Sequence, residues 1–385
     1  MTGLLERLGI GDAGTGIEIQ PVTDRSSLER FIRVPFALHR NDPVWVPPLV
    51  MERRAALSPS KNPYFRHAEA AFWIAQRDGR DVGRISAQID RLAEADTGHF
   101  GLLAAVEDEG VVGALMDTAE NWLRIRGKTQ VLGPFNLSIN EETGLLVDGF
   151  NTPPMMMMGH DRSYLGPLLE RVGYGKVKDV LAYICDGPEL PTAVQALVGR
   201  EPPPNVRIRR LCMPEYRREI DALTSIFNDA WSGNWGFIPL TQDEIDHMAR
   251  QMKPLIDERL VWFAEVNGEP AAFAVCLPNL NEAIRDLDGR LLPFGWATLL
   301  WRLKVSGVRS ARVPLMGVRR KYSGSLMGAR LAFRIIAAIR RESAALGMHR
   351  IEMSWVLEDN HPMRRIAEAV GGHAYKTYRV YGKSL

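Results

Sequence analysis

The residues most able to carry chemistry lie in one stretch, GPFNLSINEETGLLVDGFNTPPMMMMGH, at residues 133–160. His160, Glu141 and Glu142 are candidate general bases, as is Glu265 in the second half of the chain. A histidine titrates near pH ~6.5 without help from its surroundings, which suits a base at neutral pH. We expect His160 and Glu142 to act in catalysis, and a purely structural role is the alternative for each.

The same stretch has no helical or strand periodicity, so we expect a strand ending at Phe135 and then a polar loop that lines a pocket. Asn136, Ser138 and Asn140 alternate along this loop and could hydrogen-bond the polar groups of a substrate. Glu141 could bind a cationic group of that substrate, or it could cap a helix.

Four consecutive methionines, Met155–Met158, follow the loop. Methionine is flexible and polarizable, and surfaces rich in it adapt to long apolar ligands. We expect Met156 and Met158 to contact such a ligand. The alternative is that half of the four are core residues of a strand, because neighbours in a strand point to opposite faces.

A second candidate site is ARVPLMGVRRKYSGSLMGARLAFRIIAAI, residues 311–339, which predicts a strand, a basic glycine-containing loop and a long helix. Amide groups at a helix N-terminus point outward without partners and attract anions. The alternative is a loop that is basic for no functional reason. The residues expected to contact the anionic ligand are Met316, Val318, Arg319, Arg320, Lys321, Gly324 and Ser325.

The run WVLEDNHPMRRIAEAVGGHAYKTYRVYGK, residues 355–383, places Asn360 after a strand, then a helix, a Gly-Gly pair and a tyrosine-rich strand. With the preceding loop it resembles the GNAT acyltransferase superfamily over residues 211–385. This resemblance implies that the loop holds the pyrophosphate of coenzyme A, that Asn360 completes the cofactor wall and that Tyr381 lies near the leaving thiolate. The alternative for Tyr381 is a residue of the core. The usual Gln/Arg-x-x-Gly-x-Gly/Ala pattern is here Lys321-x-x-Gly324-x-Leu326, so the pyrophosphate contacts depart from the family pattern.

Longer motifs narrow the resemblance. NPYFRHAEAAFWIA at residues 62–75, the opening stretch and FNDAWSGNWGFIPL at residues 227–240 resemble a branch of tandem GNAT-like proteins that includes bacterial ceramide synthases. The resemblance implies an acyl-CoA-dependent N-acyltransferase that forms an amide on a long-chain sphingoid base, sphinganine or its 3-oxo form. One alternative is a GNAT N-acetyltransferase acting on a small or peptidyl amine. The other is a non-catalytic lipid- or CoA-binding protein, which the altered loop favours.

An apolar insert at residues 284–305, IRDLDGRLLPFGWATLLWRLKV, is too short to span a bilayer. It could lie at a membrane interface or cover an acyl chain, and we expect Trp296 to contact the substrate. The alternative is an ordinary amphipathic helix packed on the sheet.

The elements around these motifs occur twice. Each half shows a strand hairpin with a glycine-containing turn, then a helix, a short strand, another helix and a last strand. This order predicts an α/β (α+β) unit used twice. The resemblance implies that these are two tandem GNAT-like domains, each a mixed, mostly antiparallel sheet flanked by helices. The prolines of EPPPNVRIRR, residues 201–210, predict a stiff connector, so we expect domains at 1–200 and 201–385.

The two expected domains differ at the position of the phosphate loop. The first half carries Glu107, Asp108 and Glu109 there, and acidic side chains repel a pyrophosphate. We therefore expect the first domain to shape the acceptor pocket and the second to bind acyl-CoA.

The chain as a whole, 385 residues with a net charge of +2, gives no electrostatic reason to bind nucleic acid. Its three cysteines form no CxxC pair, and we expect a reducing compartment and no metal site. The sequence shows no signal peptide and no apolar run long enough to cross a bilayer. We therefore expect a cytoplasmic protein. The family resemblance implies acyl-CoA and a lipid amine as its partners, with peripheral contact to the inner face of the membrane.

Overall fold

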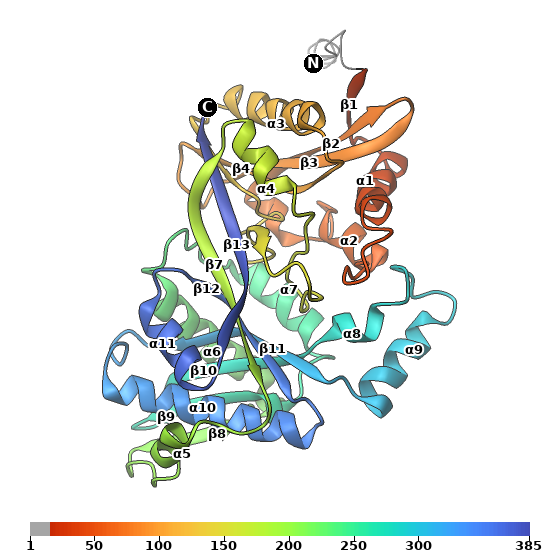
Figure 1. Cartoon of the computed structure of the whole chain (residues 1–385). Helices are drawn as coiled ribbons and strands as arrows, with labels where there is room; N and C mark the ends of the chain where they lie inside the picture. The colour runs from red at the N-terminus through yellow and green to blue at the C-terminus, as the bar shows by residue number, and fades with distance from the viewer. Residues whose placement is uncertain (1–15) are drawn as a thin grey trace. The chain divides into compact units, whose positions relative to one another are not determined.

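The computed structural model describes residues 16–385, which divide into two compact units (Figure 1). Unit 1 contains the described residues up to Asp179 and the C-terminal segment Tyr378–Leu385, and unit 2 is Val180–Thr377. The chain passes from unit 1 to unit 2 within β7 (Gly175–Asp186) and returns to unit 1 within β13 (His373–Ser384). The division thus falls inside strands, whereas the sequence placed it at the triple proline. Residues 202–204 form an irregular connector within unit 2.

The sheet of unit 1 joins β1 (Ile17–Pro21), β2 (Ala68–Arg77), β3 (Arg80–Asp90) and β4 (Thr97–Ala105) in antiparallel order. β5 (Gln130–Gly133) pairs with β4 in parallel and with the end of β13 antiparallel. The hairpin predicted from RDGRD is confirmed as β2–β3, with Asp78 and Gly79 both at positive φ in its turn.

The helices of unit 1 begin and end at residues that explain their limits. Asp108 caps α3 (Glu109–Arg124), since its carboxylate accepts the Val111 N–H at 3.0 Å and pairs with Arg77 at 2.9 Å. A carboxylate therefore occupies the electropositive end of α3, where the sequence analysis considered a phosphate. The other elements are α1 (Arg25–Leu38), α2 (Val50–Ala56), a 3₁₀ turn (Pro63–Arg66), β6 (Leu145–Asp148) and α4 (Leu165–Arg171).

Unit 2 repeats the pattern. β8 (Val206–Arg210), β9 (Val261–Val266), β10 (Glu269–Pro278) and β11 (Ser310–Val318) are antiparallel neighbours. β12 (Arg350–Leu357) pairs in parallel with β11 and antiparallel with β7. The helices are α5 (Thr192–Val198), α6 (Tyr216–Trp231), α7 (Gln242–Met252), α8 (Leu280–Ile284), α9 (Gly295–Trp301), α10 (Leu326–Ala345) and α11 (His361–Ala369), with a π-helical turn (Arg302–Ser306) after α9.

The long helix predicted after the basic loop is confirmed as α10. Leu331, Ile335 and Ile339 recur at helical spacing and are at most 2% exposed in the core of unit 2. Their burial against β9 and β10 fixes the start of the helix beside the end of β11. In residues 16–385 we find no helix with the length and apolarity to cross a membrane.

Strands β11 and β12 separate along their length. They pair only from Ser310 with Arg350 to Val313 with Met353, although β11 continues to Val318 and β12 to Leu357. Beyond Val313 each strand presents backbone amide groups that the other does not bind. This divergence opens the sheet of unit 2.

Candidate functional site

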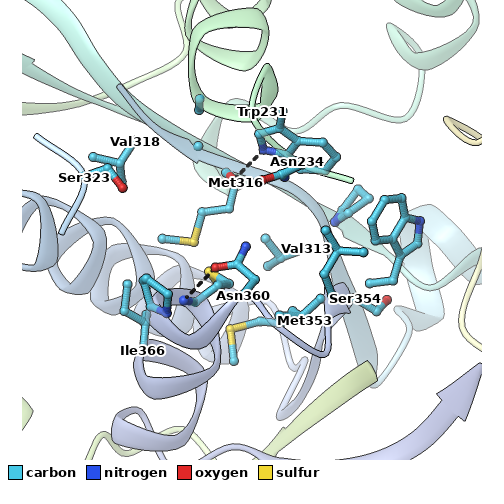
Figure 2. A pocket seen from close by; sticks show the side chains of 18 residues that line it. Trp231, Asn234, Val313, Met316, Val318, Ser323, Met353, Ser354, Asn360 and Ile366 are labelled. Atoms are coloured by element: carbon cyan, nitrogen blue, oxygen red, sulfur yellow. Dashed lines mark hydrogen bonds between the residues drawn. The ribbon is translucent and has the colours of Figure 1, made fainter. Parts of the chain in front are cut away.

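A pocket of about 180 Å³ lies at this divergence and is here called the unit 2 pocket (Figure 2). Its walls come from β11, β12, the end of α6 and the start of α11. Trp231 donates its indole N–H to the Met316 carbonyl at 3.4 Å and lies 5.8 Å, centroid to centroid, from the Trp355 ring. The residues labelled in Figure 2 are Trp231, Asn234, Val313, Met316, Val318, Ser323, Met353, Ser354, Asn360 and Ile366.

Three residues predicted to contact the cofactor line this pocket: Met316, Val318 and Asn360. Asn360 follows β12 and caps α11, because its side-chain oxygen accepts the Met363 N–H at 3.2 Å. Most of the lining side chains are apolar, and a few polar side chains and backbone groups stand among them, which is the composition of a small-molecule site.

The basic side chains of the predicted loop bind groups on neighbouring elements and so fix its conformation. Arg319 donates to the Pro270 carbonyl at 2.7 Å and to Ser225 Oγ at 2.9 Å, and Lys321 Nζ lies 3.1 Å from Glu269. Arg320 is tied through its backbone N–H to Asp229 at 2.7 Å and through its guanidinium to Ser232. These contacts place the loop against α6 and β10, so part of its basic character serves its shape.

The start of α10 has the geometry that an anion site needs. Ser325 caps the helix by accepting the Gly328 N–H at 3.1 Å and donates to the Tyr322 carbonyl at 2.6 Å. A Cβ on Gly328 would lie 2.2 Å from that carbonyl oxygen, so only glycine permits the close turn. Gly324 takes φ +71°, which glycine adopts without strain. The first amides of α10 point out of the helix and create positive potential at its N-terminus, which attracts anions.

A buried polar network extends from the unit 2 pocket, and the sequence analysis missed it. Ser354, which lines the pocket, donates its hydroxyl proton to Glu352 and accepts from Arg312 Nε at 2.7 Å. Tyr375 donates to the second carboxylate oxygen of Glu352. A glutamate on an otherwise apolar strand was the one sequence signal, since Glu352 stands in HRIEMSWV.

In unit 1 the polar loop forms a network around Glu142. Asn136 accepts the Leu102 N–H at 2.8 Å and donates to Glu142 at 2.6 Å, and Arg53 forms an ion pair with the same carboxylate. Burial alone would raise the pKa of Glu142, but the charge and hydrogen bond of Arg53 hold it below its ordinary value. Glu142 is therefore ionised and paired with Arg53 at neutral pH, and its expected role in catalysis stays a prediction.

Asp161 is a titratable group that the sequence analysis did not single out. Burial, with a smaller contribution from the charge of Glu142, raises the pKa of Asp161 to about 7, against the lowering effect of the Leu146 N–H. That amide lies 2.8 Å from Asp161 Oδ2. A carboxyl that titrates near neutral pH can exchange protons with a substrate.

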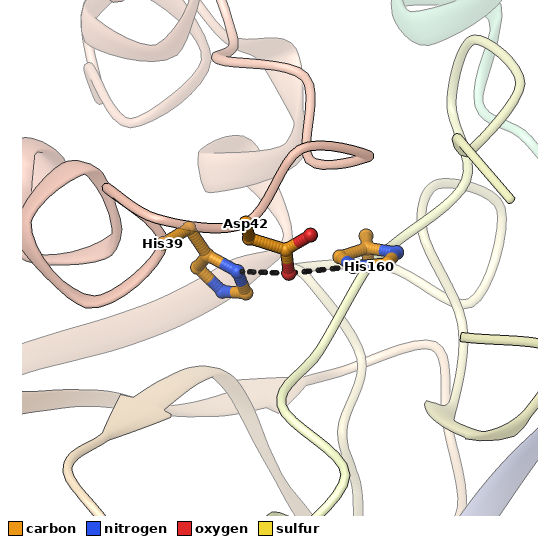
Figure 3. A group of neighbouring side chains, drawn as sticks. All are labelled: His39, Asp42 and His160. Atoms are coloured by element: carbon orange, nitrogen blue, oxygen red, sulfur yellow. Dashed lines mark hydrogen bonds and ion pairs between the residues drawn. The ribbon is translucent and has the colours of Figure 1, made fainter. Parts of the chain in front are cut away.

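His160 belongs to a cluster with His39 and Asp42 (Figure 3). One oxygen of Asp42 lies 3.0 Å from His160 Nε2 and 3.3 Å from His39 Nδ1. Burial lowers the pKa of His39 to about 4, so this imidazole is neutral at pH 7. Two imidazoles and a carboxylate suit a divalent cation, but Arg162 places a positive charge 3.7 Å from the same oxygen. The expectation that the chain holds no metal stays a prediction.

The other loop residues expected at the substrate are largely enclosed in unit 1. Ser138 is 6% exposed and accepts the Asn140 N–H at 3.1 Å, and the Glu141 N–H donates to the Ser138 carbonyl. Met156 and Met158 are each 6% exposed. Burial agrees with the core alternative for both methionines, although they lie in a turn and not in a strand.

The structure gives Tyr381 and Glu265 hydrogen-bond and ion-pair partners that were not expected from their predicted roles. Tyr381 pairs with Gly133 in the ladder of β13 and β5, donates to Glu170 at 3.3 Å and is 1% exposed in the core of unit 1. Tyr381 is not among the residues that line the unit 2 pocket. Glu265 is bound by Arg209 on β8.

Comparison with known proteins yields close relatives of the whole chain. No family model matches it. It is 53% identical over 375 residues to a Caulobacter vibrioides (strain NA1000 / CB15N) protein named bacterial ceramide synthase, covering 96% of this chain and 98% of that protein. It is 43% identical over 373 residues to Protein YghO of Escherichia coli (strain K12), covering 95% of each.

Solved structures share its fold at low identity. A tandem GNAT protein from the clavulanic acid biosynthesis pathway matches with a TM-score of 0.57 at 14% identity, covering 96% of this chain and 98% of that one. A GCN5-related N-acetyltransferase from Sphaerobacter thermophilus matches with a TM-score of 0.53 at 14% identity, covering 96% of each chain. The predicted tandem GNAT fold is thereby confirmed.

Proposed function

The chain belongs to the family of the bacterial ceramide synthases, and on this premise we propose that it transfers a long acyl chain from acyl-CoA to the amine of a sphingoid base. The product is an amide, a dihydroceramide or its 3-oxo counterpart. The single observation in the structure that supports the donor half of this reaction is the unit 2 pocket between β11 and β12.

The pocket suits the pantetheine arm of coenzyme A. The arm is extended and carries two amides, which can bind the backbone groups that the diverging strands leave facing each other. The start of α10 then receives the pyrophosphate, and Ser323 links that loop to the pocket wall. Met316, Val318 and Asn360 contact the arm, while Arg319, Arg320 and Lys321 shape the loop and supply positive potential. Gly324 and Ser325 allow its close turn.

The acceptor half of the reaction is assigned to unit 1. Its loop offers the paired carboxylate of Glu142, the titrating carboxyl of Asp161 and the hydrogen-bonding groups of Asn136 and Asn140. An amino alcohol needs an anion for its ammonium and partners for its hydroxyls. His160, held by Asp42, stays a candidate base for this side.

We also propose that the segment after α8 contacts the membrane, where the lipid substrates reside. Half of the large apolar side chains that are exposed in residues 16–385 lie in this one stretch: Leu292, Phe294, Trp296, Leu300, Trp301 and Val305, each at least 50% exposed. Residues 285–305 also carry four basic and two acidic side chains, which favours anionic lipid. In this arrangement Trp296 contacts the bilayer surface, where it meets the lipid substrate.

The test is a thiol-release assay on purified protein with products read by mass spectrometry. Acetyl-CoA and long-chain acyl-CoA are each offered with sphinganine, 3-oxosphinganine or spermidine. Amide formation on a sphingoid base from long-chain donors only is the expected result. Turnover only with acetyl-CoA and spermidine would assign the protein to small-amine acetylation. Binding of CoA without turnover of any pair would make it a binding protein.

A further inference from the structure

The buried network beside the unit 2 pocket is more polar than its position in the fold requires. Glu352 is fully buried, and Arg312 and Ser354 are 3% and 4% exposed. A buried ion pair is weak support for stability, since well-packed apolar residues of similar size often do better. Three such groups on adjacent strands next to a pocket therefore point to a chemical role.

Ser354 is the member of the network that reaches the pocket. It is the first residue of β12 beyond the last parallel pair, Val313 with Met353, so its side chain stands where the two strands part. Its hydroxyl proton is already directed at Glu352. Its oxygen also receives the Arg312 Nε–H at 2.7 Å, which fixes the hydroxyl in this orientation. A group placed in the pocket can thus hand a proton to Ser354 while Ser354 passes its own inward.

We propose that Ser354 takes the proton from the attacking amine and that Glu352 is the final acceptor of that proton. The inference rests on the proposed acyl transfer, because it assumes that a thioester lies in the unit 2 pocket. Ser354 is the catalytic residue in this account. Glu352, Arg312 and Tyr375 act through it.

The step balances without a further reactant. The amine lone pair forms the C–N bond to the thioester carbon, and the carbonyl oxygen takes the π electrons. One N–H proton moves to Ser354 Oγ as the Ser354 proton moves to Glu352. The carbonyl then re-forms, the C–S bond breaks, and the coenzyme A thiolate receives the proton back from Glu352 through Ser354. The products are the amide and free coenzyme A.

Arg312 and Tyr375 are positioning residues for this path. Arg312 contacts both ends of it, since Nε lies 3.4 Å from Glu352 and Nη2 donates to the Ser354 carbonyl at 3.2 Å. Tyr375 holds the other carboxylate oxygen. Together they hold the Glu352 carboxylate facing Ser354.

The experiment compares S354A and E352Q with wild-type protein, using whichever amine the wild type acylates fastest. S343A is the matched control, because Ser343 is a fully buried serine of α10 that does not line the pocket. S354T tests rescue by a retained hydroxyl, and H160Q tests the rival base. The measurements are kcat, KM for acyl-CoA, CoA binding by calorimetry and the pH dependence of the rate.

We expect kcat to fall at least 100-fold in S354A and E352Q, the usual range for losing a general base, with KM and CoA affinity within threefold of wild type. S343A stays within threefold of wild type, and S354T recovers at least tenfold over S354A. The residual rate of S354A rises about tenfold per pH unit, because it then depends on free amine. A kcat of S354A within threefold of wild type, loss of CoA binding in S354A or E352Q, or a loss confined to H160Q would each overturn the proposal. If the wild type prefers an amine other than a sphingoid base, the proposed substrate fails while this comparison still decides the proton path.

Discussion

Charged side chains buried in unit 1 hold one another in fixed protonation states. Glu142 is the clearest case, since Arg53 and Asn136 both bind its carboxylate and its pKa lies below the ordinary value. Such a residue contributes charge and position to a site but does not itself titrate near neutral pH.

Substituting Glu142 by glutamine should therefore destabilise the fold. The change removes one of the two ion pairs of Arg53, whose side chain is 24% exposed and also lies 3.4 Å from Glu52, so the loss should be about 1–3 kcal/mol. Urea unfolding measures this loss. E29Q is the matched control, because the Glu29–Arg54 pair is 33% and 39% exposed and should contribute less than about 1 kcal/mol. Equal losses in the two variants would contradict the importance assigned to burial.

Asp161 should make stability depend on pH. Its folded pKa is raised to about 7 from an ordinary 3.8, so the folded state holds a proton that the unfolded state has released. This contribution is fully present below pH ~4 and is lost as pH rises to ~7. D161N has no such proton, so its stability relative to wild type should rise over this interval, by on the order of 4 kcal/mol. A difference between the two proteins that is flat in pH would refute the raised pKa.

For single residues, the sequence predicted the position of a side chain better than it predicted the side chain's hydrogen-bond partners. The resemblance to the GNAT superfamily placed Asn360 in the cofactor wall, and Asn360 lines the unit 2 pocket. The pairing of His160 with Asp42, and of Ser354 with Arg312, joins residues far apart in the chain. Only the folded sheet brings such residues together, so no local pattern could show these contacts.

Among elements, the hairpins and α10 were predictable because each depends on local spacing. The RDGRD turn supplies two residues suited to positive φ, and α10 repeats apolar residues at helical intervals. The division between units was less accessible. β7 and β13 continue through it, and a strand that serves two units carries no compositional break.

The loop before α10 gives an element-scale prediction. G328A would place a Cβ 2.2 Å from the Tyr322 carbonyl oxygen and should open the turn, which raises the dissociation constant for coenzyme A at least tenfold. Calorimetric titration with coenzyme A measures it. G113A in α3 is the control, because its Cβ would meet its nearest neighbour at 3.8 Å. The free energy of unfolding of G113A should rise by about 0.5–1 kcal/mol, and its affinity for coenzyme A should be unchanged. Unaltered binding in G328A would exclude this turn from the cofactor site.

For the whole molecule, the exposed apolar segment predicts binding to lipid. A triple variant, F294S/W296S/W301S, should lose at least tenfold in partition onto phosphatidylglycerol vesicles, measured by co-sedimentation. M51S and I125S are controls, since Met51 and Ile125 are 60% and 68% exposed but lie outside the segment. A wild-type protein that stays in the supernatant, or a triple variant that binds equally well, would contradict the proposed contact between this segment and the membrane.

The reaction product defines the function of the whole molecule, and one experiment in which two acyl donors compete identifies that product. Equal concentrations of palmitoyl-CoA and acetyl-CoA are offered with sphinganine in a single reaction, and the amides are quantified by mass spectrometry. We expect N-palmitoyl sphinganine in at least 100-fold excess over N-acetyl sphinganine. Comparable amounts of the two amides, or N-acetyl sphinganine alone, would contradict a long-chain N-acyltransferase.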